Sequence, residues 1–322
     1  MSLLAVEDLH VWFDLPHGGR LHAVQGVDFG VDAGERLGLV GESGCGKTTA
    51  LLALMGLLPP SAEVDGRVVV DGQEILRGGE DSMRPRRWTD VAMIFQGAMN
   101  AFNPVKTVGA QIVEPMEFHG IASGSEAKTR AGELLNLVGI PPAAAERYPH
   151  EFSGGMRQRA AIAMALACDP KVLLADEPTT ALDVMVQAQI LQLLVSLTHD
   201  LGLAVILVTH DLPLVTQVCD RAVVMYAGRI AEAGPVDTLF HDPRHPYTRL
   251  LFEATPDLTG DVEVVSIPGA PPRLDRELVG CPFEPRCDRA FDPCKVTTPA
   301  LIPVAANHRA ACHLNDDRAA VP

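Results

Sequence analysis

A glycine-rich segment between two apolar runs has the residue types and spacing of a phosphate-binding loop. It follows residues 37–40, precedes the helix-like run 50–58, and reads Gly41, Glu42, Ser43, Gly44, Cys45, Gly46, Lys47, Thr48 and Thr49. This is the pattern G-x-x-x-x-G-K-(S/T), in which loop amides turn toward an anion at a helix N-terminus. We expect Lys47 to reach the outer phosphates and Thr48 to hold Mg²⁺. The alternative is a glycine-rich turn with an exposed lysine.

Two adjacent carboxylates end a second apolar run, residues 171–175. Asp176 is expected to complete the magnesium site opposite Thr48, as the acidic residue of a phosphate-loop enzyme does. Glu177 is expected to orient and polarise the attacking water. Because adjacent strand residues point to opposite faces, the two carboxylates cannot share one role, and the bend before Pro178 must aim them. The alternative is a pair of acids that caps the next helix.

A serine and two glycines precede an alanine-rich stretch that is predicted to be a helix. Ser153 is a natural N-cap, and Gly154 and Gly155 permit close backbone approach to an anion. The start of this helix is therefore a second candidate phosphate site. A flexible turn with a cap is the alternative.

Side chains near the ends of other predicted strands extend the candidate site. His210 follows the apolar run 204–209, and ligands of doubly wound sheets collect outside such strand ends, so we expect a γ-phosphate contact. Gln96 joins another strand to a helical region, where two parts of the chain are expected to move against each other. The first strand carries Trp12 and Phe13. Phe13 is the candidate for stacking on a purine base, with a core aromatic as the alternative.

The composition limits the classes of partner. The 322 residues are 47% hydrophobic and have a formal net charge of -15. This supports one large domain plus a smaller appendage, or two domains, and argues against general affinity for nucleic acid or anionic lipid. No apolar segment typical of a secretion signal follows Met1, and the apolar runs fall short of the roughly 20 residues that span a bilayer. Any membrane crossing is expected from other subunits.

Apolar periodicity predicts the elements that position these residues. Alternating apolar and polar side chains predict strands over 3–13 and 23–31, and a D-G turn predicts a hairpin around 68–72. Prolines punctuate the region from 97 to about 149, where short helices such as 126–138 are predicted. This region is interpreted as a helical insert in an α/β core.

Residues 1 to about 240 resemble the nucleotide-binding subunit of an ATP-binding cassette (ABC) transporter. The segments that carry the resemblance are GESGCGKTT, Gln96, FSGGMRQR, LLADEP, Ala181-Leu182-Asp183 and His210, in the family's order. The sequence departs from the usual pattern at Cys45, Phe152 and Met156, none of which is a catalytic group. The implied fold is α/β: a P-loop NTPase core of the ABC type with an antiparallel β subdomain, a helical insert and a small cysteine-containing C-terminal extension.

The resemblance implies an ATPase that works as a head-to-tail pair. Each ATP would lie between the phosphate loop of one subunit and the Ser153–Gly155 turn of the other. Glu177 would be the catalytic base, His210 the γ-phosphate sensor, Gln96 the link to transport and a member of the magnesium site, and Asp183 a contact across the pair. The implied cofactors are ATP and Mg²⁺.

The tail narrows the resemblance to the ATPases of dipeptide and oligopeptide importers. It carries HDPRHPYT from residue 241, a proline-rich link at 267–272 and GCPFEPRC from residue 280, and the segment MIFQGAMN at 93–100 also agrees. The implied partners are a second, related ATPase subunit, two transmembrane permease subunits and, indirectly, an extracytoplasmic substrate-binding protein. The implied location is peripheral, on the cytoplasmic face of the cell membrane. Relatives with this tail serve dipeptides, oligopeptides, nickel and some sugars, so the cargo stays open.

Four of the seven cysteines lie in the tail, at Cys281, Cys287, Cys294 and Cys312. Their spacing differs from the tight pairs of structural zinc sites, and four thiolates suffice for an iron–sulfur cluster. Spacing alone favours a metal site over free thiols, and the resemblance implies a [4Fe-4S] cluster. A structural staple is favoured over redox sensing, because small domains commonly depend on metal for stability.

The predicted boundaries are an ABC nucleotide-binding domain at 1–240, with its insert at about 97–168, and the extension at 241–322. A soluble cassette ATPase acting on DNA or the ribosome is disfavoured, because the chain has neither a long coiled coil nor a second cassette, and it is acidic. An exporter subunit is disfavoured by the tail.

Overall fold

The computed structural model describes residues 2–16, 18–76, 79–97, 101–180, 182–254, 267–276 and 278–318. The chain divides into two compact units. The first comprises 1–4, 31–36 and 69–208, and the second comprises 5–30, 37–68 and 209–322. Ala181 and residues 98–100, which contribute to the sequence resemblance, lie outside the described residues.

Three parallel strands form the buried centre of the first unit. β7 (Val172–Asp176) lies between β6 (Val91–Ile94) and β8 (Ala204–Val208), and every residue of the three is buried. Parallel strands covered on both faces appear in sequence as continuous apolar runs, which is how these three were predicted. The prediction of these strands is confirmed.

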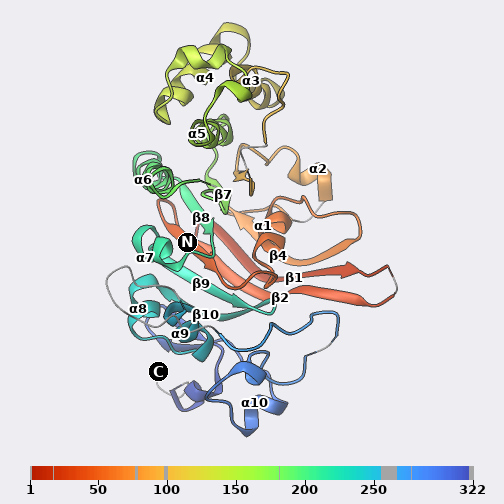
Figure 1. Ribbon diagram of the computed structural model, residues 1–322. Helices are drawn as coiled ribbons and strands as arrows, with labels where there is room; N and C mark the ends of the chain where they lie inside the picture. Colours follow the sequence, from red (N-terminus) through yellow and green to blue (C-terminus); the bar gives the residue numbers. More distant parts are fainter. Residues whose placement is uncertain are drawn as a thin grey trace. The chain divides into compact units, whose positions relative to one another are not determined.

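Helices make up most of the rest of the first unit. They are α2 (Gly79–Met83), α3 (Val108–Phe118), α4 (Gly124–Leu137), α5 (Gly154–Ala165) and α6 (Val184–Leu201), with short 3-10 turns at Pro142–Glu146 and Pro149–Glu151. α3, α4 and α5 contact one another and gather as one group, yellow to green in Figure 1. The helix predicted at 126–138 is confirmed as α4.

The predicted hairpin is present where β4 (Ala62–Val70) meets β5 (Gln73–Glu74). The two turn residues, Asp71 and Gly72, have φ of 49° and 75°. Two successive positive φ values define the type I′ turn that the D-G pair favours.

The second unit contains the antiparallel strands β1 (Leu4–Asp14) and β2 (Arg20–Val31), with β4 on the other side of β1. The predicted alternation along β1 shifts phase part-way. Val6 is buried before the shift, and Leu9 and Val11 are buried after it. Asp8 has φ of 48° and causes the shift, because one left-handed residue turns the following side chains to the other face.

A second group of strands in this unit holds the start of the phosphate loop. β3 (Arg36–Val40) runs parallel to β9 (Arg221–Tyr226), and β10 (Arg229–Pro235) pairs antiparallel with β9. The helices of the unit are α1 (Lys47–Leu54), α7 (Leu212–Val218), α8 (Val236–His241) and α9 (Pro246–Glu253).

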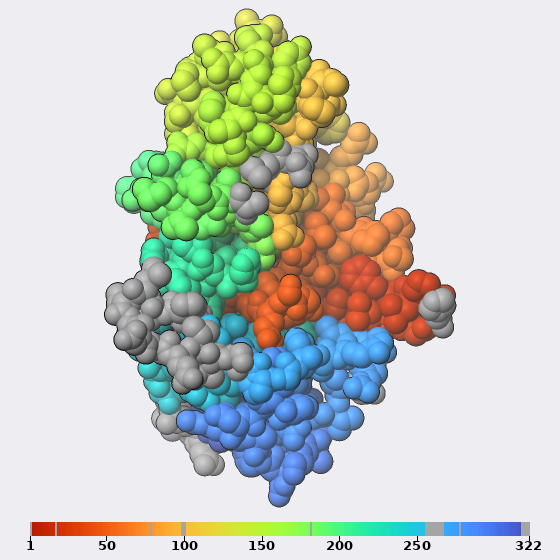
Figure 2. All heavy atoms as spheres, in the orientation of Figure 1, coloured from red at the N-terminus to blue at the C-terminus, as the bar shows by residue number. Residues whose placement is uncertain are grey.

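The C-terminal extension adds two strands to the β10 edge. β12 (His308–Ala310) pairs antiparallel with β10, and β11 (Ile302–Ala305) pairs with β12. The extension also contains α10 (Asp292–Val296) and 3-10 turns at Glu284–Arg286 and His313–Arg318. The described residues from 267 onward are blue in Figure 2. Sequence analysis missed both strands because each is only a few residues long, without a readable period.

Candidate nucleotide site

The phosphate loop has the predicted strand–loop–helix context within the second unit. β3 ends at Val40, and α1 begins at Lys47 with Gly46 as its N-cap at φ 105°. A Cβ on Gly46 would lie 2.6 Å from the carbonyl oxygen of Ala23, and one on Gly41 would lie 2.2 Å from that of Met225. Both glycines are therefore required by close backbone approach, as well as by their positive φ.

Lys47 is buried inside its own loop. Its Nζ donates to the carbonyl oxygens of Gly41 at 2.7 Å and Glu42 at 2.9 Å. Ser43, Gly44 and Thr48 are exposed beside it at the start of α1. The helix N-terminus and the ammonium group together make this loop an anion site, and the exposed Thr48 hydroxyl is an oxygen donor of the kind that Mg²⁺ takes.

Cys45 stands where the resemblance leads one to expect serine. Its side chain is 5% exposed and contacts Lys47, with Nζ 3.5 Å from Sγ. Burial raises the pKa of this thiol, against the opposing effect of Lys47. The buried thiol therefore acts as a small apolar filler inside the loop, which is why the departure is tolerated.

Two predicted catalytic residues meet in the first unit. Glu177 follows β7 at φ 45°, and its Oε2 accepts hydrogen bonds from Gln96 Nε2 at 2.8 Å and Thr180 Oγ1 at 2.9 Å. The left-handed residue is the bend that was predicted to separate the roles of the two carboxylates. Asp176 is 2% exposed at the end of β7 and offers carboxylate oxygens suited to Mg²⁺. Thr180 was missed because no spacing rule marks it.

The glycine-rich turn begins α5 as predicted. Ser153 is the N-cap, and its hydroxyl accepts the N–H of Met156 at 3.3 Å. A Cβ on Gly155 would lie 2.7 Å from Cγ1 of Val186 on α6, so close helix packing demands this glycine. Asp183 is itself the N-cap of α6 and accepts the N–H of Val186 at 2.9 Å. The cap role of Ser153 is confirmed, and a further role for either residue stays a prediction.

Trp12 is engaged by its neighbours on the surface of β1 and β2. Its ring stacks on His22 at 4.6 Å and His10 at 5.2 Å, and the Arg20 guanidinium lies 5.3 Å from its centroid. Phe13 is half-buried at the next position. Since adjacent strand residues face opposite ways, Phe13 does not join this stack and stays the predicted base contact.

His210 is exposed in the second unit, one residue before the N-cap of α7. The next residue, Asp211, accepts the N–H of Leu214 at 3.3 Å and so fixes the start of the helix. The γ-phosphate role of His210 stays a prediction.

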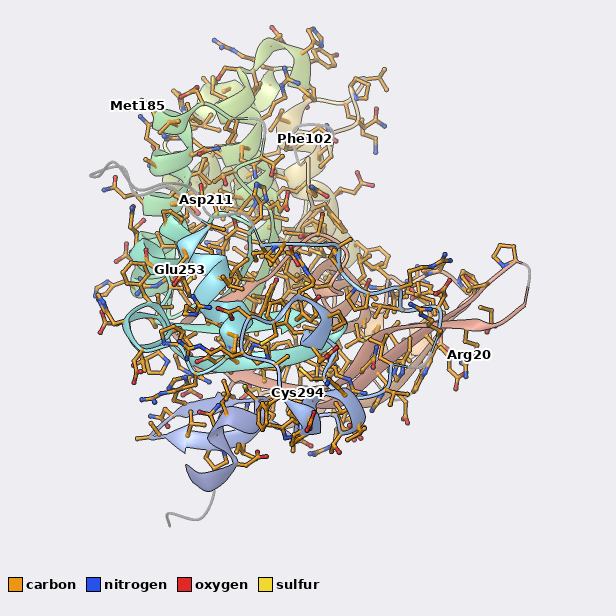
Figure 3. The ribbon with its side chains drawn as sticks, turned by 60° about the horizontal axis from the view of Figure 1, so that its bottom comes forward. Arg20, Phe102, Met185, Asp211, Glu253 and Cys294 are labelled. Carbon is orange, nitrogen blue, oxygen red and sulfur yellow. The ribbon has the colours of Figure 1, made fainter. Side chains whose placement is uncertain are left out.

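The four tail cysteines lie in the extension, with Cys294 on α10 labelled in Figure 3. The seven cysteines all lie in the described residues, and none of them forms a disulfide. A backbone amide lies close to one of the tail sulfurs. The Arg289 N–H reaches Cys287 Sγ at 3.4 Å. Such amides stabilise thiolates and are found around the sulfurs of metal clusters.

Burial dominates the titration of these thiols. It raises the pKa of Cys281 to about 11 and that of Cys312 to about 12, and Cys287 and Cys294 raise both pKa values further. However, within the part of the chain that the structure describes, no group of three or more His, Cys, Asp or Glu side chains is placed to hold a metal ion. The predicted [4Fe-4S] site thus lacks a preformed ligand cage.

Comparison with known proteins shows to which family this chain belongs. Residues 24–180 match the ABC transporter family, and residues 231–294 match the oligopeptide/dipeptide transporter C-terminal region. A probable peptide ABC transporter ATP-binding protein of Sinorhizobium fredii is 48% identical over 316 residues, which are 96% of this chain and 94% of that protein. The chain belongs to the ABC transporter ATP-binding family. Its type of activity is that of an ABC ATPase, as the sequence predicted.

Other relatives place this ABC ATPase in the peptide branch. A dipeptide transport ATP-binding protein of Bacillus subtilis is 46% identical over 324 residues, covering 99% of this chain and 96% of the relative. A dimeric ATP-binding cassette in a post-hydrolysis state with ADP and Pi matches with a TM-score of 0.64 at 29% identity, over 72% of this chain and 98% of that one. Both the predicted family and the cassette fold are confirmed. Among the described residues, no helix is long and apolar enough to cross a membrane.

Proposed function

We propose that this ABC ATPase hydrolyses ATP to power the import of dipeptides or oligopeptides. The observation that carries the proposal is the end-to-end similarity to peptide and dipeptide transport ATP-binding proteins, including the C-terminal region that marks that branch. The phosphate loop and the hydrogen-bonded Glu177 supply the chemistry that such a role needs.

In the proposed mechanism, catalysis is positioning and electrostatics. Lys47 neutralises phosphate charge at the N-terminus of α1. Thr48, Asp176 and Gln96 are the residues that would hold Mg²⁺, which neutralises further phosphate charge when bound. Glu177, held by Gln96 and Thr180 through one carboxylate oxygen, accepts the proton of the attacking water.

The assembly proposed is a head-to-tail pair with a related ATPase subunit. The Ser153–Gly155 turn of one subunit would cover the ATP on the loop of the other, Asp183 would contact the partner, and His210 would contact the γ-phosphate. The pair would bind two permease subunits at the cytoplasmic face of the membrane, with an extracytoplasmic binding protein choosing the cargo. Co-purification with those subunits, followed by identification of the bound ligand, tests this assembly.

The test of the catalytic proposal is Glu177→Gln. An amide oxygen in the position of Oε2 accepts the same bonds from Gln96 and Thr180, so the local geometry persists while the charge is lost. ATP binding is expected to be unchanged. Turnover is expected to fall by a factor of about 10²–10⁴, the usual contribution of a general base. Hydrolysis at the wild-type rate by this variant removes Glu177 from the base role.

We also propose that the extension, residues 241–322, binds a [4Fe-4S] cluster beside the nucleotide-binding domain of 1–240. The four cysteines of the extension and the Arg289 N–H, 3.4 Å from Cys287 Sγ, support this. A cluster gives each thiolate its own iron, so the sulfurs need not converge on one point. When bound, the cluster would cross-link an extension with little apolar core.

Iron and acid-labile sulfide in anaerobically purified protein test the cluster, with about four irons per chain expected. Cys287→Ser is expected to lose iron, whereas Cys219→Ser, which changes a thiol outside the extension, is the matched control. Equal iron content in both variants contradicts the site. Equal ATPase rates with the cluster oxidised and reduced would favour the staple over redox sensing.

A further inference from the structure

The second residue of the phosphate loop carries a negative charge where a polyanion is expected. The Glu42 side chain is 25% exposed, and its own carbonyl oxygen accepts from Lys47 Nζ at 2.9 Å. A carboxylate here repels phosphate unless its charge is compensated. The compensation comes from a segment more than 200 positions later in the chain.

Arg286 of the extension binds this carboxylate with both arms of its guanidinium. One terminal nitrogen lies 2.6 Å from Glu42 Oε2, and the other lies 2.9 Å from Oε1. The Arg286 side chain is 4% exposed, and the hydrogen bonds to Glu42 raise its pKa. A two-armed, nearly buried pair of this kind fixes geometry as well as charge.

The remaining donors of Arg286 bond to two other residues of the second unit. Nε donates to the carbonyl oxygen of Pro268 at 2.7 Å, and a terminal nitrogen donates to the Tyr226 hydroxyl at 3.2 Å. The guanidinium therefore cannot follow Glu42 freely, and it is Glu42 that is held in place.

The backbone of Glu42 is held as well. Its N–H donates to the hydroxyl of Tyr247 at 2.8 Å. Tyr247 is fully buried, and its ring lies 4.6 Å from that of Tyr226 and 5.3 Å from that of Phe283. Two side chains from beyond residue 240 thus fix both the main chain and the side chain of one loop residue.

We propose that Arg286 and Tyr247 are positioning residues of the nucleotide site, so that the C-terminal extension sets the affinity of the phosphate loop for ATP. This rests on the proposed ATP-binding function. Arg286 neutralises Glu42 and holds it away from Lys47, and Tyr247 fixes the strand-to-loop turn. Lys47 then keeps its charge available to phosphate.

A purely structural role for Arg286 makes a different prediction. If Arg286 only fastens the 267–272 link through Pro268, its loss weakens the extension whether or not Glu42 is charged. If it acts through Glu42, removing the carboxylate as well restores nucleotide affinity. A double-mutant cycle separates the two roles.

The experiment measures the affinity of the full chain for a fluorescent ATP analogue with Mg²⁺, for wild type, Arg286→Met, Glu42→Gln and the double variant. Arg286→Met is expected to bind about tenfold more weakly, the order for one uncompensated charge near phosphate in a partly solvated site. Its KM for ATP is expected to rise while kcat is kept. Glu42→Gln and the double variant are expected to differ from each other by less than about threefold, and the double variant is expected to bind more tightly than Arg286→Met. Arg289→Met, which removes an exposed charge from the same extension, is the matched control.

Two results overturn the inference: Arg286→Met binding as tightly as wild type, or the double variant binding as weakly as Arg286→Met. If Arg286→Met does not fold, Arg286→Lys and Tyr247→Phe decide. Each is expected to weaken binding about threefold, and unchanged affinity in both overturns the inference. Failure of the wild-type chain to bind the analogue refutes the ATP-binding proposal itself, and the inference with it.

Discussion

A single buried carboxylate, Glu232 of β10, connects three segments of the second unit. It is 0% exposed. Its Oε1 accepts the N–H of Arg244 and the Nε2 of His308, each at 2.7 Å, and its Oε2 accepts the N–H of His245 at 2.9 Å. Glu232→Ala removes the acceptor for all three donors, so we expect a large loss of stability.

The size of the stability loss depends on which of the three donors cannot bond to water once the carboxylate is removed. The N–H of His245 and the Nε2 of His308 are buried, whereas the N–H of Arg244 is part-buried and can turn to water. Each buried donor left without an acceptor costs about 1–3 kcal/mol, so Glu232→Ala is expected to lower the free energy of unfolding by roughly 2–6 kcal/mol. Glu232→Gln keeps the acceptor at Oε1 but turns an NH₂ toward the N–H of His245, so about 1–3 kcal/mol is expected.

Urea unfolding, with hydrogen exchange to resolve the second unit, measures both variants. Faster exchange is expected at the amides of Arg244, His245 and β12. Glu253→Gln on the exposed end of α9 is the control. An ordinary surface substitution changes the free energy of unfolding by no more than about 0.5 kcal/mol. If Glu232→Ala changes it by no more than that, the reasoning is refuted.

Three further predictions concern other groups. Burial lowers the pKa of His245 to about 4 from 6.5, so the folded state binds fewer protons and stability is expected to fall from pH 6.5 toward 4; His245→Asn, an alternative N-cap, should flatten that slope in urea titrations. Burial raises the pKa of Cys312 to about 12 from 9.0, so metal-free protein is expected to lose stability above pH 9, and Cys312→Ala should lessen the loss. Gly155→Ala is expected to lower stability by about 1–3 kcal/mol, because the new methyl group overpacks against Val186. Calorimetry of the double variant with Val186→Ala should show that part of this stability is regained.

Local patterns made much of the core predictable. Short-range rules predicted the phosphate loop and the buried strands β6, β7 and β8. They also predicted the helix cap at Ser153 and the D-G turn between β4 and β5. The meeting of Gln96 with Glu177 was foreseeable in part, because both follow neighbouring parallel strands.

Contacts distant in sequence were not predictable in this way. Nothing local marks Arg286 as the partner of Glu42, since the pairing depends on how the extension folds back on its own unit. The bend at Glu177 was predicted, but nothing local marks Thr180 as the residue that bonds the Glu177 carboxylate. The phase shift at Asp8 likewise depends on the opposite strand, where a Cβ on Gly66 would lie 2.5 Å from the carbonyl oxygen of Asp8.

The pairing of β12 with β10 has a consequence for solubility. Without the extension, β10 would present unpaired N–H and C=O groups, an open template for association between chains. In the intact unit the edge strand on this side is β11, a four-residue strand that contains Pro303. Proline cannot donate a hydrogen bond to an incoming strand, so the new border of the sheet resists intermolecular pairing. A chain truncated before residue 302 lacks β11 and β12 and is therefore expected to aggregate.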